Sequence, residues 1–152
     1  MKINLVKIIL SIIIFSGFSV AQSNGFGLGI IVGQPTGISA KYWTTGSTAF
    51  DFGLGYSFEK RGRMHFHADY LFHSKNMFNS VENISLYYGP GARLKSVENA
   101  NARLGIRFDV GIVWIPRNAP VDVFVEIAPS LDVIPETFFF VNGGVGVRYF
   151  FN

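Results

Sequence analysis

Three polar side chains that could bind a metal ion or take part in catalysis occupy alternate positions in the sequence: His65, His67 and Asp69. Imidazole and carboxylate groups are common metal ligands, and a histidine next to a serine can activate that serine as a nucleophile. Ser57 and Ser85 are the serines on the neighbouring segments. Ligands on one strand face cannot converge on one ion without help from another strand, and serine near histidine is commonplace in a polar interior. We therefore predict no metal, no cofactor and no catalytic residue.

Acidic and basic residues in nearly equal numbers occupy the same alternate positions along the rest of the chain. If these positions face a narrow protein interior, as argued below, such charges are stable only when they are paired. We therefore predict a salt-bridge network that fills the interior and leaves little room for conduction. Candidate pairs are Asp109 with Arg93 and Glu126 with Arg107. The predicted inward set is Asp51, His65, His67, Asp69, Arg93, Lys95, Arg103, Arg107, Asp109, Glu126, Asp132 and Arg148.

These side chains lie on segments with a period of two. From Gly25 onward, large apolar residues occupy every second position, and glycine, charged or small polar residues lie between them. Turn-forming residues such as Gln34-Pro35-Thr36 separate the segments. Pro90 and Pro129 fall inside segments and predict bulges or lost pairing. The pattern predicts about eight strands and no helix, near positions 25–33, 38–42, 50–58, 64–73, 86–95, 103–114, 121–133 and 141–151.

The composition bears on what surrounds this sheet. The chain has 152 residues, enough for one domain, and only 15% of them are charged, against roughly 25% in ordinary soluble domains. Aromatic residues make up 16%. The absence of cysteine excludes disulfides, thiolate metal sites and a cysteine-linked lipid anchor. We infer that something other than water covers much of the surface.

Volume decides which face of the strands points inward. The interior of an eight-stranded barrel is just wide enough for side chains to fill, and four or five large side chains from every strand cannot fit there. The glycine-rich and polar face must therefore point inward and the apolar face outward, as in transmembrane barrels. Replacing outward Leu54 or Ile106 by arginine should then impair assembly, and replacing inward Gly53 or Gly105 by alanine should be milder.

The first 21 residues have the pattern of an export signal. Lys2 and Lys7 precede an apolar run at positions 8–15, and Ser19-Val20-Ala21 supplies the small residues at a cleavage site. The run is shorter than the ~20 residues of a spanning helix. We predict a signal peptide at 1–21 and a barrel domain at 22–152. Without the two lysines the net charge of +3 falls to about +1, which indicates no nucleic-acid-binding patch.

The mature segment resembles the small eight-stranded outer-membrane barrels of the OmpA and OmpX type. The most specific motif is the end, Gly146-Val147-Arg148-Tyr149-Phe150-Phe151, in which Gly146, Tyr149 and Phe151 match the family's C-terminal assembly signal. Gly144 and Asn152 depart from that pattern. The resemblance implies location in a bacterial outer membrane, periplasmic chaperones and the outer-membrane assembly machinery as partners during biogenesis, and termini on the periplasmic side.

The function predicted from these observations is that of an integral outer-membrane barrel, surrounded by lipid, with a structural role in the envelope and a plugged polar interior. We expect a monomer. The main alternative is a small porin-like channel. A lipid-modifying barrel enzyme and a soluble periplasmic ligand-binding barrel, which would show the same alternation, are two further hypotheses.

Overall fold

The computed structural model describes residues 24–57, 63–75, 78, 83–97, 99 and 101–151. The predicted signal peptide, its cleavage site after Ala21, and Asn152 lie outside the described residues. So do most of the predicted connection between 74 and 83 and the charged connection at 58–62. Among the described residues, no helix is long and apolar enough to cross a membrane.

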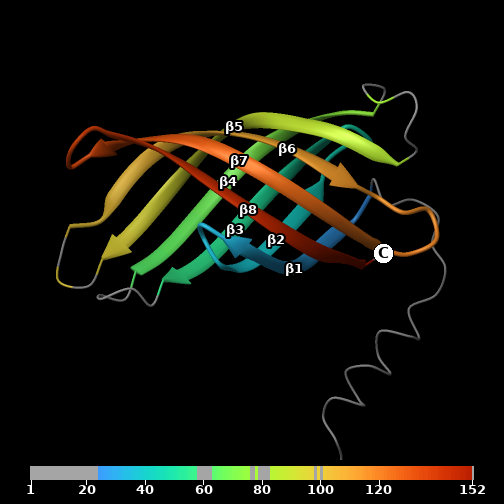
Figure 1. The fold of residues 1–152 in the computed structure, drawn as a ribbon, viewed down its shortest axis with the longest axis horizontal. Helices are drawn as coiled ribbons and strands as arrows, with labels where there is room; N and C mark the ends of the chain where they lie inside the picture. Colours follow the sequence, from blue (N-terminus) through green and yellow to red (C-terminus); the bar gives the residue numbers. More distant parts are fainter. Residues whose placement is uncertain are drawn as a thin grey trace, which may run out of the picture.

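The chain forms a closed barrel of eight antiparallel strands in which each strand pairs with its neighbours in sequence and β8 pairs with β1 (Figure 1). The predicted all-β, eight-stranded antiparallel up-and-down barrel is confirmed. The strands run obliquely across the molecule (Figure 1). They are β1 (Phe26–Gly33), β2 (Gly37–Trp43), β3 (Thr48–Ser57), β4 (Arg63–Ser74), β5 (Ile84–Val97), β6 (Arg103–Trp114), β7 (Val121–Ile134) and β8 (Phe138–Phe151).

Both strand prolines coincide with lost pairing, one of the two outcomes predicted for them. At Pro90 the β4–β5 pairing is interrupted between Asp69↔Gly91 and Phe72↔Tyr88, and the register on either side is the same. The β6–β7 pairing is interrupted in the same way opposite Pro129. Each proline therefore removes pairing on one side without adding a bulge, because it lacks only the N–H donor. The register shift in the β6–β7 ladder lies elsewhere, between Leu104↔Ile134 and Gly105↔Asp132.

The two faces of the strands are segregated as the alternation predicts. Large apolar side chains point outward on every strand; Ile30, Ile106 and Val125, for example, are 57%, 58% and 53% exposed. Every Asp, Glu, Lys and Arg of the eight strands occupies an inward position of the alternation, and most of them are buried. The barrel therefore has an apolar exterior and a charged interior, the reverse of a water-soluble domain.

The wall of the barrel is uneven in height at one of its two ends. We call the end with the β1–β2, β3–β4, β5–β6 and β7–β8 connections the mouth end, and the end where β1 begins and β8 ends the terminal end. At the mouth end, the β1–β8 ladder stops at Gly33↔Gly144, so the first residues of β8 have no partner on β1. The backbone N–H of Gln34 donates to the carbonyl of Gly143 at this limit. The wall is consequently lowest at the β1–β2 turn.

Candidate functional site

The centre of the interior is organised around Arg107 on β6. Its guanidinium Nε lies 3.0 Å from a carboxylate oxygen of Asp69 on β4, and its NH2 group lies 3.6 Å from both Asp109 and Glu126. The Nε–H is not aligned with the Asp69 oxygen, so this contact is an ion pair without a hydrogen bond. The single guanidinium of Arg107 thus compensates the charge of three buried carboxylates.

A second group of charged side chains is centred on Arg148 of β8. It connects β8 to β7 and, across the β1–β8 seam where the barrel closes, to β2 and β3. Arg148 on β8 donates from Nε to Asp122 on β7 at 3.0 Å, and its NH1 contacts Asp51 on β3. The same NH1 lies 3.3 Å from the hydroxyl of Ser39 on β2. Lys41 on β2 lies 4.0 Å from Asp51. Because these residues are at most 2% exposed, their charges are compensated within the protein rather than by water.

Some ion pairs join strands that are separated by one strand between them, and a glycine on that middle strand leaves room for the contact. Gly91 on β5 lies between Asp69 and Arg107 in register, and a Cβ built on it would come within 1.7 Å of the Asp69 carboxylate. Gly105 on β6 lies in the same way between Arg93 and Asp132, whose side chains are 3.3 Å apart. Long side chains can cross a strand only where no side chain stands in the way.

The surroundings of Gly53 and Gly105 bear on the prediction that alanine there is milder than arginine at an outward position, which stays a prediction. A Cβ on Gly105 would meet the Asp132 carboxylate at 2.7 Å and the backbone carbonyl of Leu131 at 2.8 Å. A Cβ on Gly53 would lie 2.2 Å from the ring of His67. The space above both glycines is already filled by neighbouring side chains or backbone, so a methyl group cannot be added without displacing them.

Apolar side chains close the interior toward the terminal end. One buried cluster comprises Ile31, Leu71, Tyr87, Val113 and Phe124, and a second comprises Trp43, Ala49 and Phe150. Ile115, in the β6–β7 connection, packs against both clusters. The hydroxyl of Tyr87 donates to Glu126 at 3.1 Å, and the guanidinium of Arg148 lies 4.0 Å from the Phe124 ring centroid. Apolar and charged layers are thus in direct contact.

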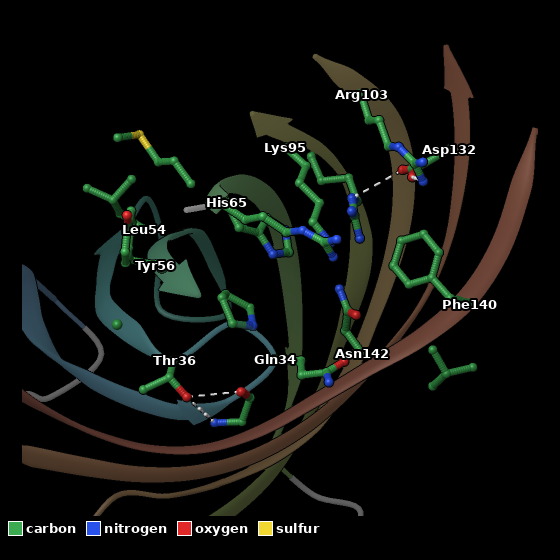
Figure 2. A pocket seen from close by; sticks show the side chains of 18 of the residues that line it. Gln34, Thr36, Leu54, Tyr56, His65, Lys95, Arg103, Asp132, Phe140 and Asn142 are labelled. Atoms are coloured by element: carbon green, nitrogen blue, oxygen red, sulfur yellow. Dashed lines mark hydrogen bonds and ion pairs between the residues drawn. The ribbon is translucent and has the colours of Figure 1, made fainter. Parts of the chain in front are cut away.

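The mouth end, in contrast, holds a cavity of about 1020 Å³. Its polar lining includes His65, Arg93, Lys95 and Arg103 on β4 to β6, and Asn142 on β8 lies across from them. Figure 2 shows His65, Lys95 and Asn142 around a common space, with Arg103 and Asp132 at its edge. The β1–β2 turn, the end of β3 and the first part of β8 also line it.

The predicted inward residues all occupy inward positions of the strands, but they differ in how deeply they are buried. Ten of them are buried; Lys95 is half-buried and Arg103 is exposed at the mouth. The predicted Arg107–Glu126 pair is present. The predicted pair of Asp109 with Arg93 is wrong, because the β5–β6 register places Arg93 opposite Gly105 and Asp109 opposite Gly89. The ten buried residues are Asp51, His65, His67, Asp69, Arg93, Arg107, Asp109, Glu126, Asp132 and Arg148.

Three buried acidic or basic residues are missing from the predicted set: Lys41, His73 and Asp122. Lys41 donates to His73 Nε2 at 2.8 Å, and Asp122 pairs with Arg148. Each lies at the inward parity of its strand, as Ser39 does on the strand of Lys41. The alternation alone could therefore have identified all three.

The histidines form no recognisable reactive centre among the described residues. His67 Nε2 lies 3.7 Å from Asp69, and the rings of His65 and His67 are 5.8 Å apart. In the part of the chain that the structure describes, no group of three or more side chains could hold a metal ion, and no side-chain hydrogen bond that the structure gives joins a serine hydroxyl to a histidine ring. The side chain of Ser57 lies outside the described part.

A scan against models of protein families and searches of curated proteins and of solved structures return no significant match to this chain.

Proposed function

We propose that this protein is an integral outer-membrane β-barrel with a structural role in the bacterial envelope and a plugged interior. The observation that carries the proposal is the complete segregation of charge: every acid and base of the strands is inward, and large apolar side chains ring the outside. In water this exterior would expose a continuous apolar surface far larger than monomeric soluble proteins tolerate. In lipid it is solvated, and closure pairs the strand backbone internally.

The soluble ligand-binding barrel is less well supported by the same observation. Such a barrel turns its apolar face inward around a ligand and its polar face outward to water. Here the most exposed strand positions include Ile30, Ile127 and Val141, each more than half exposed. A partner protein would have to cover the whole circumference to replace lipid.

The contents of the interior favour a plugged barrel over a porin-like channel. The Arg107 and Arg148 groups fill its centre and the two apolar clusters fill its terminal end. Water and ions would have to separate buried ion pairs to pass. The mouth cavity is the observation that favours the channel as second candidate, because it would form a wide entrance if the network below it opened.

The location is tested by fractionation and by gel migration. Membranes from cells expressing the full chain should contain the protein in the outer-membrane fraction, and a sample left unboiled in detergent should migrate differently from a boiled one, because a closed barrel resists detergent until heated. Recovery in the soluble periplasmic fraction, with identical migration of both samples, would refute the membrane proposal.

Conductance in planar lipid bilayers separates the two candidate functions. We expect at most small, flickering currents from the purified wild-type barrel. The variant Arg107→Met, which breaks the central group, should increase them. A large and steady wild-type conductance would show an open interior and would make the porin-like channel the better assignment.

A further inference from the structure

The charges of the interior are distributed unevenly along the barrel axis. The centre and the terminal end hold Arg107, Arg148 and Lys41 with more acids than bases, namely Asp51, Asp69, Asp109, Asp122 and Glu126. The mouth end has more bases than acids. Arg63, Arg93, Lys95 and Arg103 line its cavity, and Asp132 is the one acid among the described lining residues.

Asp132 does not neutralise this group. It lies 3.3 Å from Arg93 and 3.9 Å from Arg103, and the structure gives no ion pair between Lys95 and any described acid. Lys95 is directly opposite Arg103 in the β5–β6 ladder. Like charges in directly opposed positions destabilise a sheet. Folding alone therefore does not explain why two bases face one another here.

Buried polar atoms in the same lining also lack partners. His65 is 8% exposed and Asn142 6% exposed, yet His65 Nε2 and the amide Nδ2 of Asn142 make no hydrogen bond with a described residue. The Nε of Arg63 is likewise buried without a hydrogen-bond acceptor. Buried donors without acceptors are costly to stability. These groups surround the cavity on the β4 side and the β8 side (Figure 2).

We propose that the mouth cavity is a binding site for a phosphate group. A phosphate carries two negative charges near neutral pH and several acceptor oxygens, which matches a group of arginines and a lysine together with an amide donor. Low-dielectric walls with one sign of charge also concentrate counter-ions at such an opening. This proposal goes beyond the structural role in the envelope. It does not depend on that role, because the cavity and its basic lining are features of the barrel fold itself.

The phosphate can reach the cavity from two sources. A free phosphorylated solute would enter along the barrel axis. A lipid phosphate would enter over the β1–β2 turn, where the wall is lowest and the cavity lining includes the exposed apolar residues Ile38 and Val141. The shared chemistry is the phosphate itself, so the test measures phosphate binding first and then its source.

The first measurement is calorimetric titration of the barrel, folded from the full chain in detergent micelles, with inorganic pyrophosphate at constant ionic strength. We expect saturable binding, at least fivefold weaker in Lys95→Gln and in Arg103→Gln, with Lys95→Arg close to wild type. Arg117→Gln removes the same charge from a connection at the opposite end and is the matched control. Unboiled gel migration verifies that each variant is folded.

The source is then identified in phosphatidylcholine vesicles that contain phosphatidic acid or, at equal surface charge, phosphatidylglycerol. Displacement of pyrophosphate by phosphatidic acid in particular would support a lipid phosphate, and pyrophosphate binding unaffected by either lipid would support a soluble one. If pyrophosphate does not bind, or if Lys95→Gln, Arg103→Gln and Arg117→Gln all bind like the wild type, the phosphate site is refuted. That refutation would leave the fractionation and conductance results, and the proposed function, unaffected.

Discussion

Replacing Arg107 by methionine tests whether the interior network stabilises the barrel. Methionine keeps much of the side-chain length but removes the guanidinium that lies 3.0 Å from Asp69 and 3.6 Å from both Asp109 and Glu126. Three carboxylates would then face one another in a space with almost no access to water. Breaking a buried pair by removing one partner costs about 3–5 kcal/mol. Because three acids share this base, we expect the loss to be near the upper end of that range.

Second substitutions should recover part of this loss. Removing Glu126 together with Arg107 eliminates one of the three uncompensated acids, so the two effects should not add. Asp69 makes the shortest contact with Arg107, and Arg107→Met combined with Asp69→Asn should recover more stability than Arg107→Met combined with Glu126→Gln. The order of the two recoveries follows directly from the distances.

The free energy of unfolding can be measured by urea titration of the barrel in detergent micelles, with the fluorescence of Trp43 and Trp114 as the signal. Trp43 is buried in the terminal-end cluster and Trp114 is exposed at the end of β6, so the two report from different surroundings. Arg117→Met, in an exposed connection, is the control. A loss below about 1 kcal/mol for Arg107→Met, or strictly additive double variants, would refute the reasoning.

Three further outcomes follow from other parts of the interior and from the outer face. Ile106→Arg should lower stability in a bilayer by about 2–4 kcal/mol, whereas Ile106→Leu should assemble normally; equal assembly of both in outer membranes would contradict a lipid-facing position. Gly91→Ala should lower stability, since its Cβ would overlap the Asp69 carboxylate; an unchanged urea midpoint would show that the carboxylate can move away at little cost. Tyr87→Phe removes the hydroxyl that donates to Glu126 and should cost about 1.5–3 kcal/mol, and no change in unfolding would mean that this hydrogen bond is not formed.

The sequence predicted the strands and their faces because both follow from a period of two. Ile106 and Arg107 are adjacent, so the alternation placed them on opposite faces, and the small interior volume of an eight-stranded barrel assigned Arg107 to the inside. The prolines were harder to interpret. Pro90 and Pro129 disturb the ladders, but a missing N–H removes pairing without requiring an extra residue, and the register shift at Leu104/Gly105 has no proline to indicate it.

The pairing of the interior charges could not be predicted in the same way. It depends on how far each strand is shifted against its neighbours, and the alternation is unchanged by a shift of two residues. Arg93 was assigned to Asp109 on an adjacent strand, but its actual partner, Asp132, is two strands away across Gly105. A search for a glycine opposite each charge, rather than for a complementary charge, would have located this pair.

These glycine-bridged contacts also bear on why the barrel has eight strands. Asp69 with Arg107 and Arg93 with Asp132 each join strands that are two apart, and Arg148 on β8 reaches Asp51 on β3 across the closure. Such side chains meet because the wall is strongly curved, so that inward positions on separate strands converge. In a wider barrel the same residues would diverge and leave their charges unpaired. The ion pairs of the interior therefore fit only one barrel circumference. Duplicating or deleting a hairpin would separate the paired charges and destabilise the barrel. The number of strands is set by the interior charges as much as by the turns that connect the strands.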